Sequence, residues 1–67
     1  MNLCKQARQK TGLTQVKFSE VTQIPVSTIQ DWEKGARKPG SAALTLLRLI
    51  NHNPVMLTDI LSELGKE

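Results

Sequence analysis

Helix start and stop signals recur at short intervals along these 67 residues, and they constrain the fold more than any other feature. Gly12 and Gly35 suit the left-handed residue that ends a helix, and Thr14, Pro25 and Ser41 suit helix starts. Strand-like alternation of polar and apolar residues is absent. The sequence therefore predicts an all-α fold, a single compact domain (residues 1–67) of five short helices. Their expected ranges are 2–10, 15–21, 25–34, the segment capped by Ser41, and 54–64.

Apolar residues recur every three or four positions within these segments, as in helices with one buried face. We expect them to form the core, with Trp32 packed inward rather than stacking on a base. The expected inward residues are Leu3, Ala7, Val16, Phe18, Val21, Ile29, Trp32, Leu44, Leu47 and Ile50. A further apolar stripe serves as core, as a dimer contact, or as both. Its residues are Met56, Leu57, Ile60, Leu61 and Leu64.

Small size and few reactive residues argue against catalysis. Cys4 is the only cysteine, so no disulfide can form within the chain, and we expect an inert, half-buried thiol. Cys4 and His52 are the only soft metal ligands, whereas structural zinc needs four. No Ser–His–acid set, Cys–His set or phosphate-binding glycine loop can be proposed. We expect no enzymatic activity, no cofactor and no metal.

The charge of +3 is unevenly distributed along the chain. Residues 1–48 contain eight basic and three acidic side chains, whereas residues 49–67 contain one basic and three acidic. A basic body of this kind favours a polyanionic partner. No signal peptide is visible, and the apolar stretch 42–50 is far shorter than the ~20 residues of a membrane span. We therefore expect a cytoplasmic protein. Peripheral membrane binding is disfavoured, because the basic residues lie in the other half of the chain from the apolar stripe.

The second and third predicted helices have the layout of a DNA-binding helix-turn-helix, at about residues 14–33. They are joined by a three-residue turn and followed by the basic loop 36–40. Along the third helix, the face opposite Ile29 and Trp32 carries hydrogen-bonding groups, as a helix in the major groove requires. These residues are Ser27, Gln30, Asp31 and Lys34.

The residues of this region resemble the Cro/phage-repressor (XRE) type of helix-turn-helix. The resemblance rests on Leu13-Thr14-Gln15, Phe18-Ser19 and the run Val26-Ser27-Thr28-Ile29-Gln30-Asp31-Trp32-Glu33-Lys34-Gly35. The continuation, Arg37-Lys38-Pro39 and Ala43 to Ile50, looks like the subset found in HigA- and MqsA-type antitoxins. The resemblance covers about residues 3–62 and implies a five-helix, lambda-repressor-like fold whose recognition helix spans about residues 26–34.

The family pattern also implies roles for individual residues. It places Val26, Ser27 and Asp31 on base edges, and Gln15 and Lys34 on DNA phosphates, with Arg37 and Lys38 extending the phosphate contact into the loop. Thr28 and Gln30 lie beside the base-facing positions, within reach of a phosphate or the next base. We expect Gln30 to read a base and Thr28 to contact a phosphate. The family pattern pairs Arg8 with Glu33 as a structural ion pair between the first and third helices; the alternative for Arg8 is a free phosphate ligand.

Three positions depart from the pattern or carry an alternative interpretation. Gln23 occupies a turn position that is usually glycine, because the backbone there favours a positive φ. Ser19 replaces the usual small alanine. Asp31 brings a carboxylate towards DNA, where phosphates repel it although a cytosine amino group could donate to it. Alternatively, Asp31 pairs with Lys34 on the helix surface.

We therefore expect a sequence-specific double-stranded DNA-binding regulator, a repressor or an autoregulating antitoxin. It would bind a palindromic operator as a homodimer, and an antitoxin would also have a toxin protein as partner. The alternative is a protein-binding module that uses the same fold, with a toxin or polymerase subunit docked on the fourth and fifth helices.

Overall fold

The computed structural model describes residues 2–64, and these residues form five α-helices. The helices are α1 (Leu3–Thr11), α2 (Gln15–Thr22), α3 (Val26–Lys34), α4 (Ser41–His52) and α5 (Val55–Leu64). The predicted all-α architecture is confirmed. The Cα radius of gyration is 11.2 Å, as expected for one domain of this length.

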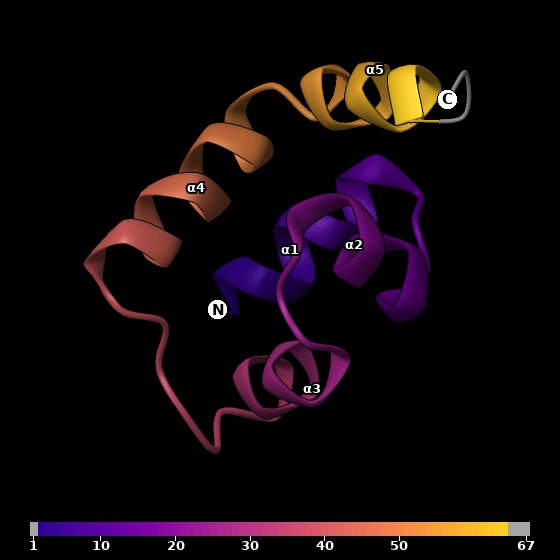
Figure 1. The fold of residues 1–67 in the computed structure, drawn as a ribbon. Coiled ribbons are helices and arrows are strands. Elements are labelled where there is room, and N and C mark those ends of the chain that lie inside the picture. Colours follow the sequence, from indigo (N-terminus) through magenta and orange to yellow (C-terminus); the bar gives the residue numbers. More distant parts are fainter. Residues whose placement is uncertain (1, 65–67) are drawn as a thin grey trace.

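Helix α1 lies at the centre of the arrangement (Figure 1). It packs most extensively on α4 and also contacts α3 and α5, while α2 contacts α3 and α5. Helices α3 and α5 lie at opposite ends in this view. The exposed surface of α3 is therefore well separated from α5.

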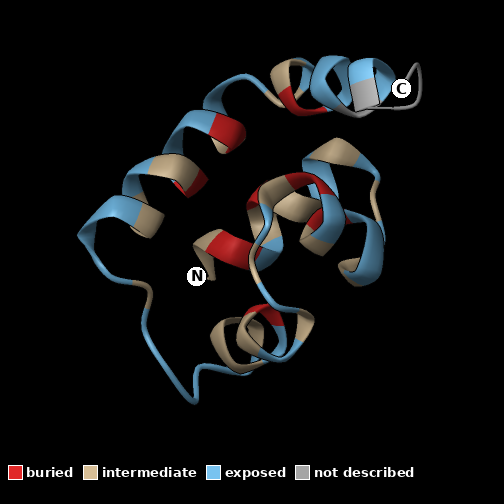
Figure 2. Cartoon of the chain, in the orientation of Figure 1, coloured by how far each residue is buried: buried red, intermediate tan, exposed pale blue. Residues whose placement is uncertain are grey.

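One hydrophobic core joins all five helices. Its buried members are Cys4, Ala7, Phe18, Val21, Ile29, Leu47, Ile50 and Leu57. Figure 2 shows these residues on the inward sides of the helices and shows most of the α3–α4 loop exposed. Leu3 and Trp32 are partly buried and pack against the core, so the inward placement of Trp32 is confirmed. Met56 is half-buried and Ile60 is exposed, whereas the side chains of Leu61 and Leu64 lie outside the described residues.

The prediction that Val16 points inward is wrong, because Val16 is 58% exposed. Phe18 and Val21 are three residues apart and share the buried face of α2. Val16 precedes Phe18 by two residues, a rotation of about 200° around the helix. It therefore lies on the opposite side.

Four helix starts differ by one residue from those predicted. Helix α1 begins at Leu3, because Asn2 is its cap. Pro25 is the extended residue before α3 rather than part of its first turn; its carbonyl accepts from the Ile29 amide at 3.1 Å. Ser41 is the first residue of α4 and makes no side-chain cap, since Gly40 occupies the cap position. Helix α5 begins at Val55, after Pro54. Gly65, the glycine that follows the predicted range 54–64, lies outside the described residues.

The predicted stops at Gly12 and Gly35 are confirmed, with φ of 75° and 79°. Thr14 caps α2 as predicted, because its side chain accepts from the amide of Lys17. Within residues 2–64, no helix combines the length and the apolar character needed to cross a bilayer.

Candidate nucleic-acid interface

Helix α3 buries one side and presents polar side chains on the other. Ile29 is fully buried and Trp32 half-buried, whereas Ser27, Gln30 and Lys34 are exposed. Val26, Thr28 and Asp31 are partly exposed beside them. The residues predicted to read bases therefore lie on the accessible surface of one helix, at the end of the molecule opposite α5 in Figure 1.

The turn before α3 is fixed by local hydrogen bonds. Gln23 adopts the left-handed conformation, with φ of 63° and ψ of 22°. Holding a residue other than glycine there costs about 1 kcal/mol. The Gln23 amide donates to the Ser19 carbonyl at 2.8 Å, and the Ser19 hydroxyl donates to the Ile24 carbonyl. Ser19 thus adds a bond to the turn that an alanine could not make.

Arg8 and Glu33 form an ion pair between α1 and the last turn of α3. Arg8 Nε lies 2.7 Å from Glu33 Oε2, and the Arg8 Nη2 donates to Glu33 Oε1 at 3.0 Å. The side chains are 17% and 7% exposed. Arg8 Nη1 also donates to the Leu13 carbonyl at 3.0 Å. One guanidinium thus holds both the segment entering α2 and the end of α3.

Gln15, the first residue of α2, joins this network. Its Nε2 donates to Glu33 Oε1 at 3.3 Å. A side-chain amide carries two N–H donors, so one remains available. Gln15 is therefore held beside the N-terminus of α2, where the helix dipole favours an anion.

Asn2 has a structural role that is not among those predicted from the sequence. Its Oδ1 accepts from the Lys5 amide at 2.9 Å and so caps α1. Its Nδ2 donates to the carbonyls of Trp32 at 2.6 Å and Glu33 at 3.1 Å. Asparagine before a helix can be recognised as a cap from the sequence. Its hydrogen bond to the Trp32 carbonyl joins residues thirty positions apart, and no local sequence pattern predicts it.

Asp31 and Arg37 form an exposed pair beside the polar face of α3. Arg37 Nε lies 3.7 Å from Asp31 Oδ2. The structure thus gives Asp31 a different partner from Lys34, the neighbour expected along the helix. After Gly35 the chain turns back, and the amides of Ala36 and Arg37 both donate to the Asp31 carbonyl.

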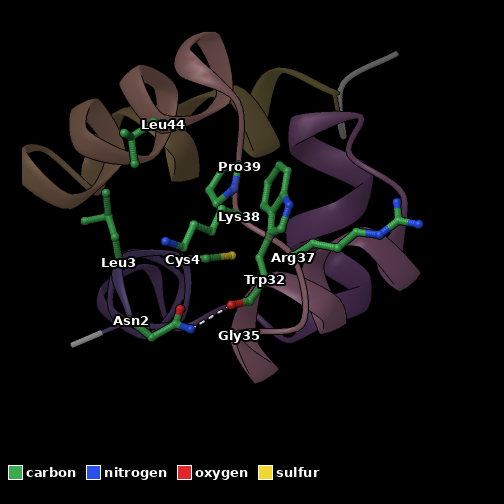
Figure 3. Close-up of a pocket in the computed structure, with 9 residues that line it drawn as sticks. All are labelled: Asn2, Leu3, Cys4, Trp32, Gly35, Arg37, Lys38, Pro39 and Leu44. Atoms are coloured by element: carbon green, nitrogen blue, oxygen red, sulfur yellow. Dashed lines mark hydrogen bonds between the residues drawn. The ribbon is translucent and has the colours of Figure 1, made fainter.

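A cavity of about 240 Å³ lies between the start of α1, the end of α3, and the loop into α4. Its walls include Leu3, Trp32 and Leu44. Figure 3 shows Lys38 extending over this cavity towards Leu3, whereas Arg37 points away from it. The two loop cations therefore face different directions, and only Arg37 accompanies the polar face of α3.

The ionisable groups of this network have shifted pKa values. The hydrogen bond from Arg8 holds the pKa of Glu33 below its ordinary value, burial acts in the opposite direction, and the bond from Gln15 lowers it further. The hydrogen bond to Glu33 raises the pKa of Arg8.

Burial raises the pKa of the Cys4 thiol to about 11, and the neighbouring Glu33 carboxylate adds to this effect. Cys4 is therefore a protonated, unreactive thiol at neutral pH. Within the part of the chain that the structure describes, no cluster of His, Cys, Asp or Glu suits a metal ion.

Acid is expected to destabilise the fold through Glu33. Its folded pKa lies below the ordinary 4.5, so the unfolded chain binds more protons in this range and stability falls as pH drops below about 4.5. Urea unfolding of the wild type and of Glu33→Gln at several pH values between 3 and 7 would measure this. The difference between the two free energies of unfolding should shrink towards low pH. A difference that stays constant would contradict the assignment.

Comparison with known proteins agrees with this geometry. The family model described as "Helix-turn-helix" matches residues 5–50, which include α2, the turn and α3. This chain belongs to the Cro/phage-repressor type of helix-turn-helix proteins. Over 52 residues, the chain is 40% identical to the uncharacterized HTH-type transcriptional regulator YiaG of Escherichia coli K12 and to the same-named proteins of the O6:H1 and O157:H7 strains. Those 52 residues cover 78% of this chain and 54% of each relative, so this helix-turn-helix chain spans about half their length. No solved structure gives a significant match.

Proposed function

We propose that this chain binds double-stranded DNA sequence-specifically as the DNA-binding domain of a transcriptional repressor. The observation that carries the proposal is the polar, exposed face of α3, with Ser27, Gln30 and Lys34 accessible and Ile29 buried behind them. The major groove is wide enough to admit such a helix. Membership of the helix-turn-helix family and the regulator name of the YiaG relatives support the same function.

Base reading is assigned to the front of α3. Gln30 can donate and accept in a bidentate contact with adenine, and Ser27 can bond to several bases. Val26 provides an apolar contact for a thymine methyl group, and Asp31 an acceptor for a cytosine amino group. Each side chain reads a different chemical feature, so together they can specify a short base sequence.

Phosphate contacts hold α3 in register in the groove. Gln15 offers its second amide hydrogen at the N-terminus of α2, while Glu33 fixes the orientation of the amide through the first. Arg8 neutralises Glu33, which reduces its repulsion of a nearby phosphate. The further contacts come from Thr28, Lys34, Arg37 and Lys38. Lys38 reaches DNA by rotating its flexible side chain away from the cavity.

We further propose that the domain acts as a homodimer on a palindromic operator, in the cytoplasm. Two α3 helices about one DNA turn apart would contact successive half-sites. Leu49, Val55 and Ile60 are 54%, 62% and 39% exposed, and they offer apolar surface on α4 and α5 for a second subunit. Repression follows when the bound dimer occupies a promoter. An autoregulating antitoxin is the more specific form of this role, with a toxin as an additional protein partner.

The second candidate function is a protein-binding module with little DNA affinity. The same apolar residues on α4 and α5 favour it, because a toxin or polymerase subunit could cover them as well as a second copy could. Variants of the α3 face would then leave function unchanged.

The proposed function predicts two different responses to substitution. Ser27→Ala should weaken binding to a duplex selected from a random library by about fivefold, with little change on a scrambled duplex, because a base contact is lost. Lys38→Ala should weaken binding to both alike and reduce the log–log salt slope by about 0.9, because a phosphate contact is lost. Fluorescence anisotropy titrations measure both, with the exposed Arg48→Ala on α4 as the charge control. Equal losses on both duplexes for Ser27→Ala would remove its base-reading role.

A further inference from the structure

The Asp31–Arg37 pair combines a side chain on the polar face of α3 with the first cation of the basic loop. Asp31 Oδ2 and Arg37 Nε lie 3.7 Å apart, and the two side chains are 38% and 73% exposed. The Arg37 backbone is anchored as well, because the amides of Ala36 and Arg37 donate to the Asp31 carbonyl at 2.9 and 3.4 Å. Arg37 is therefore held next to the carboxylate by its main chain and its side chain.

An exposed pair of this kind is weak and can exchange partners. Surface ion pairs contribute little, because water solvates both charges well. A guanidinium also binds phosphate well, through two parallel N–H groups. Without Asp31, Arg37 would be a fully available phosphate ligand. With Asp31 present, Arg37 can bind a phosphate only by breaking the ion pair, which leaves the Asp31 carboxylate uncompensated near DNA.

The free energy needed to break the Asp31–Arg37 pair depends on the base that lies next to Asp31 in the groove. At a cytosine, the amino group can donate to Asp31 and compensate the carboxylate, which releases Arg37. Guanine and thymine offer only acceptors in the major groove, so there the carboxylate has no such donor and keeps Arg37. At adenine, the N7 acceptor beside the amino group repels the carboxylate and favours the same outcome. We propose that the Asp31–Arg37 pair restrains non-specific DNA binding, because Asp31 withholds Arg37 from phosphate until a cytosine in the target site takes its place. This inference rests on the proposed function and extends it to the selectivity of the same site.

The test is a set of four proteins: wild type, Asp31→Asn, Arg37→Ala and the double variant. Binding to a scrambled duplex and to a duplex selected from a random library is followed by anisotropy between ~50 and ~200 mM salt. Asp31→Asn should bind the scrambled duplex about eightfold more tightly than wild type at ~0.1 M salt, because one phosphate contact is gained. For the same reason, the slope of log affinity against log salt concentration should become steeper by about 0.9. Its gain on the selected duplex should be below about twofold, since Arg37 is already released there.

The other variants separate release of Arg37 from simple charge removal. Arg37→Ala in the Asp31→Asn background should abolish the gain in affinity and slope on the scrambled duplex, whereas Arg37→Ala alone should change that slope little. Asp59→Asn on α5 is the matched control, because it removes one exposed carboxylate far along the chain from α3. It should leave both affinities almost unchanged.

Three results would overturn the inference. They are an equal gain on both duplexes for Asp31→Asn, a gain that persists without Arg37, and the same gain from Asp59→Asn. Wild-type protein that is folded but binds neither duplex would instead contradict the proposed function itself.

Discussion

Replacing Arg8 with methionine is expected to lower the free energy of unfolding by about 3 kcal/mol. Glu33 is 7% exposed, so its carboxylate would remain largely buried without its cation, and the Leu13 carbonyl would lose a donor. A domain of this size has only ~3–5 kcal/mol available from its core. The variant should therefore retain at most about 2 kcal/mol, and up to about half of it should be unfolded at 25 °C. Urea titration followed by the fluorescence of Trp32, the only tryptophan, measures the change.

Lys17→Met is the matched control for this prediction. It breaks the exposed pair with Glu20, whose two charged groups lie 3.3 Å apart with side chains 57% and 56% exposed. The loss should be below about 0.5 kcal/mol. Arg8→Met combined with Glu33→Met should recover part of the stability, because no unpaired charge remains. Equal losses for Arg8→Met and Lys17→Met would show that the buried pair contributes no more than a surface pair.

Affinity for duplex DNA is expected to fall by a factor of several hundred between ~50 and ~200 mM salt. Neutralising about four to six phosphates gives a log–log slope of about −4 to −5 for each monomer, because condensed cations are released from the DNA. The available cations are Lys34 and Lys38, together with exposed lysines elsewhere on the domain, and Arg37 joins them where Asp31 releases it. Anisotropy on a mixed-sequence duplex at five salt concentrations gives the slope. A slope close to zero would contradict a phosphate-anchored interface.

Helix caps and stops predict from the sequence where the helices lie. They do not predict which face of a helix is buried, or which residues far apart in the chain contact each other. Gly12, Gly35 and Thr14 act through their immediate neighbours, so their roles could be read from the sequence. Apolar character alone places Val16 on the wrong face, because a residue two positions before Phe18 lies about 200° from it around the helix. The contacts of Asn2 with Trp32 and Glu33 have no signal in the sequence, because they depend on how α1 and α3 pack.

The candidate site shows the same limits. The exposed face of α3 follows from the spacing of Ile29 and Trp32. The Arg8–Glu33 pair came from the family resemblance rather than from spacing, because the two residues are far apart in the chain. The Asp31–Arg37 pair could not be predicted, since it forms only where the backbone turns back after Gly35 and places two amides on the Asp31 carbonyl.

The central claim is that α3 docks on DNA with the flanking residues of α2 and the basic loop. A backbone amide NMR titration with a mixed-sequence duplex at ~50 and ~200 mM salt tests it most directly. The account predicts shifts at Gln15, Val26 to Lys34 and Arg37 to Lys38 that fade at the higher salt. A folded spectrum without shifts there at either salt, or with shifts confined to α4 and α5, would contradict it.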